Sequence, residues 1–507
     1  MSDTNFELLA IAIYFLAMIG IGYYAFRKTS SHEDYMLAGR ELSPTTAALS
    51  AGASDMSGWL MMGLPGAIYA AGLIEAWIAI GLTIGAYLNW RFVAPRLRAY
   101  TEVAQNSITI PSFFENRLHD RSRALRVGAG LIILVFFTFY VSSGMVAGGV
   151  FFESSFNADY QVGMLLVGGV TLLYTLFGGF LGASLTDVVQ GTMMLLGLIL
   201  VPVIAFLTVG GLSEVQDGIA ESGAELTGLF PATMDSLAVI GIISALAWGL
   251  GYVGQPHIIV RFMALRSIAS AKTARRIGMT WMIVSLIGAV VSGFIGIAYV
   301  QRSDLTLDNP ETIVLAMSQA LLHPFVAGLV LAAVLAAIMS TISSQLIVCS
   351  SALVEDLYRV VAKEPPSQQR LVLFGRLCVL GIALIAIVLA LNPSDTILEL
   401  VGFAWAGFGA AFGPIVLLSL FWRRLTNWGA LAGMVTGAVT VFLWDALEGW
   451  TGASIFTLYE ILPGFLLNLL VAVVISNMTY RENPELDAEF DEANALVSAR
   501  PSSLVPD

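Results

Sequence analysis

The stretch that decides the fold runs from Ser43 to Gly72 and reads SPTTAALSAGASDMSGWLMMGLPGAIYAAG. It is long enough to cross a bilayer, since a membrane helix needs about 20 residues. Its middle is nevertheless made of small and polar residues, namely Gly52, Ser54, Asp55, Ser57 and Gly58. We therefore predict two half-helices joined by an unwound turn near 53–58.

Such a break frees backbone carbonyl groups in the middle of the membrane. Non-helical backbone at this depth is tolerated only where it is buried in protein or lines a cavity, and in transporters unwound carbonyls coordinate small cations. A packing helix whose small residues admit close neighbours would show the same glycines and serines. Asp55 favours the functional interpretation, because a carboxylate inside a membrane is costly and is a functional candidate by default.

The composition places the whole chain in a membrane. Of its 507 residues, 57% are hydrophobic and 12% are charged, which is too apolar for a soluble protein of this length. Apolar windows predict about thirteen transmembrane helices. They fall near 6–26, 44–71, 73–94, 127–152, 161–178, 186–210, 234–256, 278–300, 312–344, 371–391, 397–421, 428–446 and 455–477. The first window lacks a basic segment before it, so we expect a retained helix rather than a cleaved signal peptide.

The basic residues indicate the orientation of these helices. All but Arg302 of the 24 lysine and arginine residues fall on one side of the predicted spans. Short loops rich in these residues face the cytoplasm, so we expect the N-terminus outside and the C-terminus inside. The residues after Arg481 are acidic and then rich in serine and proline, which predicts a solvated tail. Glu75, Glu311 and Glu399 lie near span ends and are also expected to be solvated.

A second segment, AAVLAAIMSTISSQL at 332–346, gathers hydroxyl groups at Ser340, Thr341, Ser343 and Ser344. Hydroxyl groups in a membrane helix commonly bond to a carbonyl one turn back, so the cluster alone fits a structural role equally well. The presence of a broken helix in the same chain favours a shared cation site.

Four motifs carry a resemblance to a known family: AGASDMSGWLMMGLPG at 51–66, GGFLGASLTDVVQG at 178–191, AAIMSTISSQL at 336–346 and FWRRLTNWGALAGMVTG at 421–437. In these motifs the chain resembles the sodium/solute symporters, and within them the bacterial branch that carries proline. The resemblance implies an all-α polytopic membrane protein with a five-plus-five inverted-repeat core of the leucine-transporter type. The implied parts are 1–43 (first helix and inner loop), 44–233 (first repeat and outer loop), 234–425 (second repeat), 426–480 (two additional helices) and 481–507 (cytoplasmic tail).

The resemblance also assigns residues to a sodium ion. The implied ligands are the backbone carbonyls of Ala53, Met56 and Ala337 and the hydroxyls of Ser340 and Thr341. Five such oxygens can replace the hydration shell of a small cation. Candidates for sodium coupling or for a second sodium site are Asp55, Ser57, Asp187, Ser343, Ser344 and Arg40. Asp187 and Arg40 are expected at the inner ends of spans, where a solvated charge is the alternative.

The implied substrate is L-proline, enclosed by Trp59, Gly63, Tyr140, Trp248, Tyr252 and Pro256. Its carboxylate needs donors, which the helix N-terminus after the break offers, and its ring needs flat apolar walls. Trp248 and Tyr252 are four residues apart and are expected to share a helix face. Single aromatic residues in membrane helices are often packing or interfacial residues, but the set favours a small apolar amino acid over a sugar.

We therefore expect a secondary active transporter that couples sodium entry to proline uptake across a bacterial cytoplasmic membrane. It is expected to work as a monomer in the lipid bilayer, without a nucleic-acid partner and without a cofactor other than sodium. A symporter of pantothenate, sialic acid or a sugar is the alternative, followed by a transporter-like solute sensor. An enzyme is disfavoured, because the four histidines and two cysteines are scattered and form no metal or nucleophile motif.

Overall fold

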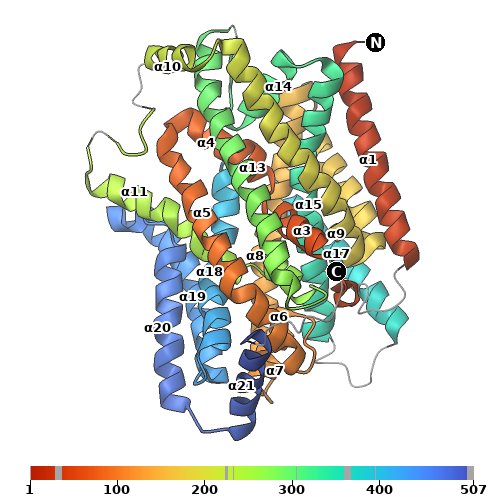
Figure 1. The fold of residues 1–507 in the computed structure, drawn as a ribbon, viewed down its shortest axis with the longest axis vertical. Helices are drawn as coiled ribbons and strands as arrows, with labels where there is room; N and C mark the ends of the chain where they lie inside the picture. Colours follow the sequence, from red (N-terminus) through yellow and green to blue (C-terminus); the bar gives the residue numbers. More distant parts are fainter. Residues whose placement is uncertain are drawn as a thin grey trace.

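The fold is described by a computed structural model that covers residues 2–28, 37–222, 226–231, 233–303, 305–358, 367–393 and 395–498. The described chain folds into packed helices (Figure 1). Part of the predicted first inner loop (29–36) and the end of the predicted tail (499–507) lie outside the described residues.

Eleven helices in the described part of the chain are long and apolar enough to cross a membrane. They are α1 (Asp3–Lys28), α5 (Ala76–Leu88) continued by α6 (Ala94–Val103), α8 (Ala124–Phe156), α9 (Tyr160–Val209), α11 (Ser236–Ala247) continued by η5 (Trp248–Gly254), α13 (Ser270–Gln301), α15 (Pro324–Ser351) continued by η7 (Ala352–Tyr358), α17 (Gln368–Ala390), α18 (Ile397–Phe421), α19 (Asn427–Thr451) and α20 (Ile461–Thr479).

One of these helices contains two of the predicted spans. At 50 residues, α9 would be about 75 Å long if straight, far more than a bilayer core of about 30 Å. Gly179 interrupts it with φ 58° and ψ −157°, a backbone conformation that glycine adopts easily. The predicted windows 161–178 and 186–210 lie on either side of this glycine. The count of thirteen spans itself stays a prediction.

The predicted break in the second span is present. α3 (Pro44–Asp55) begins after Ser43, whose side chain accepts a hydrogen bond from the backbone of Thr46 and so caps the helix. It ends at Asp55, because Met56 leaves the helical region with φ −84° and ψ 82°. The chain resumes as η2 (Trp59–Gly63) and α4 (Leu64–Ala71).

A second break, which the apolar windows did not reveal, divides the span predicted at 234–256. α11 ends at Ala247, η5 forms a 3-10 helix, and α12 (Pro256–Met263) follows. The sequence WGLGYVGQP at 248–256 combines three glycines with a proline that opens the next helix. Glycines also marked the break in the second span, so the local sequence did carry a signal.

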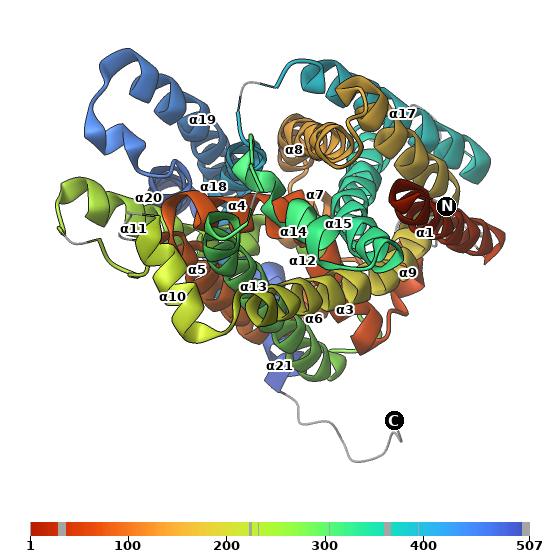
Figure 2. The same cartoon turned by 90° about the horizontal axis from the view of Figure 1, so that it is seen from above.

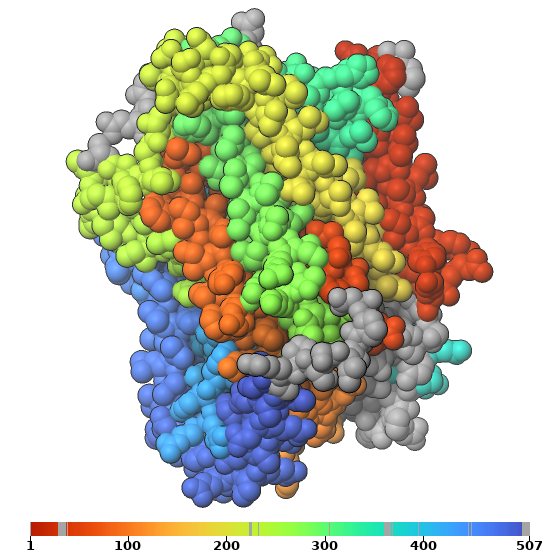
Figure 3. Space-filling model, in the orientation of Figure 1, coloured from red at the N-terminus to blue at the C-terminus, as the bar shows by residue number. Residues whose placement is uncertain are grey.

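The most buried spans are α15 and α18, which both pack against α8. In each of them 83% of the most apolar window is buried, against 33% for α1 and α20, which lie on opposite flanks (Figure 2). On one face α13 runs along the surface between α5 and α9 (Figure 3). The broken α3 packs against α9, α13 and α15, so its unwound turn is enclosed by protein.

The two ends of the bundle differ in their short helices. α10 (Leu212–Glu221) and α14 (Ile313–Leu321) lie at the same end as the N-terminus, whereas α6, α7 (Ile110–Arg117) and α21 (Pro484–Ser498) lie at the other (Figure 1). We call this second end the basic end, because it carries the arginine-rich segment 91–126.

The prediction of a solvated tail was wrong for α21. Its Phe490 is only 9% exposed and lies against Tyr100, with ring centroids 6.1 Å apart. The guanidinium of Arg117 lies 5.4 Å from the centre of the Phe490 ring, and Arg423 forms an ion pair with Asp491. The acidic helix therefore docks on basic side chains instead of remaining free in solution.

Candidate functional site

The unwound turn of the second span lies against the hydroxyl groups of α15. Ser340 Oγ lies 2.6 Å from the Ala53 carbonyl and 3.0 Å from the Ala337 carbonyl. Thr341 Oγ1 lies 3.3 Å from the same Ala337 oxygen, and the four residues are buried. The structure therefore brings four of the five predicted sodium ligands together.

These oxygen atoms fit a sodium ion. Each hydroxyl now donates its hydrogen to a carbonyl, but its oxygen retains lone pairs and the hydrogen is free to rotate. A cation between α3 and α15 would bind the same carbonyl and hydroxyl oxygens once the hydroxyl hydrogens turn away. At Met56, the fifth predicted ligand, the backbone has left the helix, so its carbonyl no longer points along the axis of α3.

Asp55 connects this oxygen cluster to the predicted substrate residues. Its side chain is 2% exposed, and Oδ2 accepts a hydrogen bond of 2.5 Å from the Tyr252 hydroxyl. Its backbone carbonyl accepts a bond of 3.1 Å from Trp59 Nε1 and lies 3.5 Å from the Tyr140 hydroxyl. Oδ1 has no hydrogen-bond partner among the described residues, which leaves it available to a cation.

Three of the predicted aromatic residues, Trp59, Trp248 and Tyr252, form one group with Trp405, whereas Tyr140 meets this group through the Asp55 carbonyl. The ring centroid of Trp248 lies 6.3 Å from that of Trp59 and 5.3 Å from that of Tyr459. Trp405 of α18, which sequence reasoning missed, stacks on Trp248 at 6.4 Å and meets Tyr252 edge-on at 5.1 Å. Its indole nitrogen donates to the Trp248 carbonyl at 2.8 Å, so Trp405 holds the η5 backbone in place.

The prediction that Trp248 and Tyr252 share a helix face was wrong. Both belong to a 3-10 helix, in which three residues make one turn, so residues four apart point about 120° away from each other. They are joined through Trp405 instead.

Gly63 and Pro256 follow the aromatic residues Trp59 and Tyr252, each by four residues. A Cβ atom at Gly63 would come within 3.2 Å of Leu398 Cβ, so this glycine allows η2 to approach the start of α18. Pro256 opens α12 and lines a small cavity together with Val260. Neither contacts the rings through a polar group, and both shape the backbone around them.

A larger cavity of about 790 Å³ is lined in part by Trp248. Its walls include Phe403 and Tyr459, and its rim carries the carboxylates of Glu75, Asp395, Glu399 and Glu460. The small cavity at Pro256 measures only about 20 Å³. The aromatic group therefore borders a large cavity on the side of the acidic loops, whereas the cavity at Pro256 is small.

The prediction that Glu311 is solvated was wrong. It lies in η6 (Pro310–Thr312) and is 6% exposed. Its carboxylate accepts hydrogen bonds from the backbone nitrogens of Ile397, at 3.0 Å, and Leu398, at 3.1 Å. Burial raises the pKa of Glu311, although these two hydrogen bonds oppose the shift. The contact ties the loop before α14 to the first turn of α18.

Asp187 is buried in α9 rather than solvated at the end of a span. Ser50 Oγ donates to its Oδ2 at 2.6 Å, and Arg261 Nη2 lies 3.4 Å from the same oxygen. Arg261 also donates to Ser344 Oγ at 2.6 Å and to the His257 carbonyl at 2.5 Å. A guanidinium thus stands between Asp187 and the predicted second-site hydroxyl of Ser344.

Sequence reasoning missed the role of Arg261, because the charge count placed it among the loop residues that set orientation. It lies inside α12, five residues after Pro256, and is 1% exposed. The one sequence signal was its position five residues after the proline that follows the break, because the pairing with Asp187 could not be read from the sequence.

The remaining candidates have local hydrogen bonds. Arg40 Nη1 donates to Thr101 Oγ1 and to the Met263 carbonyl, both at 3.2 Å, so Arg40 fastens segments of the basic end and is not solvated. Ser57 Oγ accepts from the Trp59 backbone at 3.4 Å where the helix resumes. Ser343 Oγ donates to the Ser340 carbonyl at 3.0 Å within α15.

Comparisons with known proteins agree with the resemblance. The profile of the sodium:solute symporter family matches residues 35–437. The osmoregulated proline transporter OpuE of Bacillus subtilis is 53% identical over 475 residues, which cover 94% of this chain and 95% of the relative. The high-affinity proline transporter PutP of the same organism is 54% identical, covering 95% and 100%. The sodium/proline symporter of Staphylococcus aureus is 49% identical, covering 98% and 97%.

Two solved structures share the fold. A Na+-coupled sialic acid symporter in a substrate-bound outward-open state aligns with a TM-score of 0.79 and 19% identity, covering 94% of this chain and 99% of that one. MHP1, a nucleobase-cation-symport-1 family transporter in a closed conformation, aligns with a TM-score of 0.53 and 14% identity, covering 90% and 98%. The predicted all-α symporter fold is thereby confirmed.

Proposed function

Since the chain belongs to the sodium:solute symporter family, we propose that it couples sodium entry to the uptake of L-proline by alternating access. Three relatives about half identical to it over nearly its full length are proline transporters or symporters. The observation that carries the proposal is the position of Asp55. It stands two residues after the sodium candidate Ala53 and contacts Trp59, Tyr140 and Tyr252.

This position explains how sodium and substrate affect each other. A sodium ion held by Ala53, Met56, Ala337, Ser340 and Thr341 fixes α3 on α15, and with it the Asp55 backbone that Trp59 and Tyr140 contact. The two effects are reciprocal: if bound sodium lowers the free energy of proline binding by some amount, bound proline lowers the free energy of sodium binding by the same amount. When bound, sodium supplies the positive charge that the buried Asp55 carboxylate otherwise lacks.

The substrate would be held by the same turn from its other side. Backbone N–H groups where the helix resumes after Ser57 offer donors to a carboxylate. Trp59, Tyr140, Trp248 and Tyr252 provide flat walls for the pyrrolidine ring. Sialic acid, pantothenate and sugars carry more hydroxyl groups than this aromatic enclosure can satisfy, which favours proline.

Four further assignments belong to this proposal. The basic end faces the bacterial cytoplasm and the N-terminus faces outward, by the positive-inside rule. The repeats keep the predicted boundaries 44–233 and 234–425, and the protein works as a monomer. Asp55, Ser57, Asp187, Ser343, Ser344 and Arg40 influence sodium coupling, with Asp187 acting through its contact with Arg261.

The test is uptake of labelled proline into proteoliposomes that hold the purified protein. An inward sodium gradient should drive accumulation, lithium should partly replace sodium, and potassium should not. Proline uptake that is unchanged when sodium is replaced by potassium, with no proton gradient, would refute sodium coupling. Sodium-driven uptake of pantothenate, sialic acid or a sugar without proline uptake would refute the substrate, and a failure to move any solute would support the sensor.

A further inference from the structure

Two buried polar side chains near the proposed substrate site lack hydrogen-bond partners. Both ring nitrogens of His257 and both amide atoms of Gln345 are buried and have no partner among the described residues, and each side chain is 0% exposed. Unpaired buried polar groups are costly and rare in protein interiors. Because two such side chains lie on helices that line the proposed transport path, a ligand that moves along this path could satisfy them.

The packing of α8 against α15 indicates the direction in which Gln345 faces. A Cβ at Gly144 would meet Ile342 of α15, and one at Gly130 would come near Leu357 and Asp356 of η7, so the two segments run antiparallel. Counting three residues on from Ile342 and three back from Gly144 puts Gln345 opposite Val141. Because residues three apart share a helix face, Gln345 lies on the side of α15 that packs against α8, one turn from Ile342 toward the basic end and so near Val141 and Tyr140.

His257 reaches the same level from α12. Its ring centroid lies 5.8 Å from that of Tyr140 and 5.4 Å from that of Phe137, which is one turn nearer the basic end. One turn further along α12, Arg261 donates to Ser344, the neighbour of Gln345. His257 and Gln345 therefore flank the proposed substrate site on the side of the basic end.

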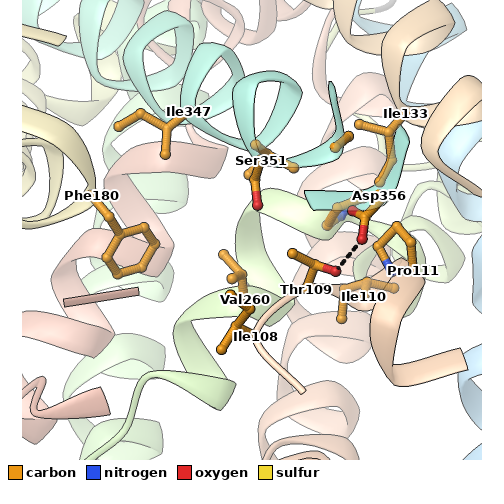
Figure 4. A pocket seen from close by; sticks show the side chains of 13 residues that line it. Ile108, Thr109, Ile110, Pro111, Ile133, Phe180, Val260, Ile347, Ser351 and Asp356 are labelled. Atoms are coloured by element: carbon orange, nitrogen blue, oxygen red, sulfur yellow. Dashed lines mark hydrogen bonds between the residues drawn. The ribbon is translucent and has the colours of Figure 1, made fainter. Parts of the chain in front are cut away.

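The small cavity of about 20 Å³ lies beyond these two residues in the same direction. Its walls include Val260 and Ile347, which follow His257 and Gln345 along their helices, together with Phe180 (Figure 4). A space of this size holds about one water molecule. At its far side Thr109 donates to Asp356 at 2.9 Å (Figure 4), and Arg126 binds the same carboxylate at 2.9 Å. This route is closed to proline in the described conformation.

We propose that His257 and Gln345 form an inner station for proline, which holds the zwitterionic end of the substrate after the basic end has opened. A neutral imidazole offers one donor and one acceptor, and the glutamine amide adds two donors and an acceptor. Together they can serve both the carboxylate and the ammonium group. They carry no net charge that would retain the substrate. The proposal rests on the proposed proline transport and orientation.

The station can be tested by measuring transport from each side separately. His257→Phe and Gln345→Met approximately keep volume but remove hydrogen bonding. At saturating sodium, each should raise the proline concentration for half-maximal efflux from the basic end by about tenfold, as expected for one lost hydrogen bond. Half-maximal uptake from the opposite end should change less than about twofold. Because a transporter cannot alter the equilibrium between the two sides, the maximal efflux rate must rise relative to uptake by the same factor.

Two controls make the result decisive. His257→Gln keeps a donor and an acceptor and should restore the wild-type efflux value, and His323→Phe, at the opposite end of the bundle, should change neither side. Equal shifts on both sides, or no shift on either, in folded variants of a protein whose wild type shows sodium-dependent proline transport would overturn the station alone. Absence of that transport in the wild type would instead refute the proposed function.

Discussion

The Tyr252 hydroxyl donates a hydrogen bond of 2.5 Å to the Asp55 carboxylate, and this bond joins the two interrupted spans at their breaks. Asp55 ends α3, and Tyr252 lies in the 3-10 segment η5. One half of the proposed site, with the sodium candidates, is thereby connected to the other half, with the aromatic group. If either broken helix moves, this hydrogen bond must lengthen or the other helix must move with it.

The first prediction concerns the charge of Asp55. Two unit charges about 5 Å apart at an effective dielectric of about 20 attract by roughly 3 kcal/mol, which corresponds to about a hundredfold in sodium binding. Asp55→Asn should therefore reduce sodium-driven proline uptake about a hundredfold at limiting sodium. Asp55→Glu should retain weakened sodium-dependent activity.

The amount of protein in the membrane serves as the control for Asp55. Tyr252→Phe removes the hydrogen bond but leaves the charge, so it should raise the half-saturating concentrations of both sodium and proline. Normal sodium affinity in Asp55→Asn would mean that the carboxylate only supports the unwound turn.

The second prediction separates sodium ligands from ordinary hydroxyl groups. Ser340→Ala removes an oxygen that lies 2.6 Å from the Ala53 carbonyl and should raise the half-saturating sodium concentration about tenfold. Thr341→Ala should act in the same direction. Ser318→Ala is the matched control, because Ser318 is buried but bonds only within α14. Weaker proline binding at saturating sodium, with unchanged sodium dependence, would show that the roles are wrongly assigned.

The third prediction concerns the aromatic enclosure. Trp248→Ala removes the ring that contacts Trp59, Trp405 and Tyr459 and should raise half-saturating proline about tenfold or more, given the worth of aromatic contacts. The sodium dependence measured at saturating proline should change much less. Trp428→Ala, at a side chain that is 56% exposed, is the control. Wild-type proline affinity in Trp248→Ala would remove Trp248 from the site.

The sequence predicted the parts of this site that depend on local composition. Small and polar residues around Asp55 indicated the break of the second span, and hydroxyl spacing indicated the cluster on α15. Both signals are physical, because an unwound turn needs residues that tolerate it and a cation needs oxygen atoms. Their meeting in space could not be read from the pattern and came from the family resemblance.

The parts that the sequence did not predict depend on geometry or on partners far along the chain. Apolar windows average over about 20 residues, so the break at η5 stayed hidden within an apolar segment. The 3-10 geometry there changed the relative direction of Trp248 and Tyr252. Arg261 resembles a loop residue until Asp187, distant in the sequence, is placed beside it.

The fourth prediction concerns the docking of α21. Phe490→Ala removes the ring packed against Tyr100 and Arg117, at a cost of about 1.5–3 kcal/mol for a buried side chain of this size. α21 should then detach more often, and trypsin should cleave after Arg481 about tenfold faster. Leu496→Ala, at a position that is 39% exposed, should leave cleavage unchanged. An unchanged rate in Phe490→Ala would show that ion pairs such as Arg423 with Asp491 hold the helix alone.

The last prediction concerns the buried pair of Asp187 and Arg261. Removing one member of a buried ion pair leaves the other charge uncompensated and typically costs about 3–5 kcal/mol. Asp187→Asn and Arg261→Gln should therefore each lower the melting temperature of the purified protein clearly. The double variant should be less destabilised than the two losses combined, with a coupling of about 1–3 kcal/mol.

The number of sodium ions per proline, measured from the reversal potential in proteoliposomes, should be unchanged in Asp187→Asn, because a guanidinium already supplies the positive charge beside Asp187. Additive losses in the double variant would refute the pairing, and a changed ion-to-proline ratio would instead make Asp187 a ligand of a second sodium ion.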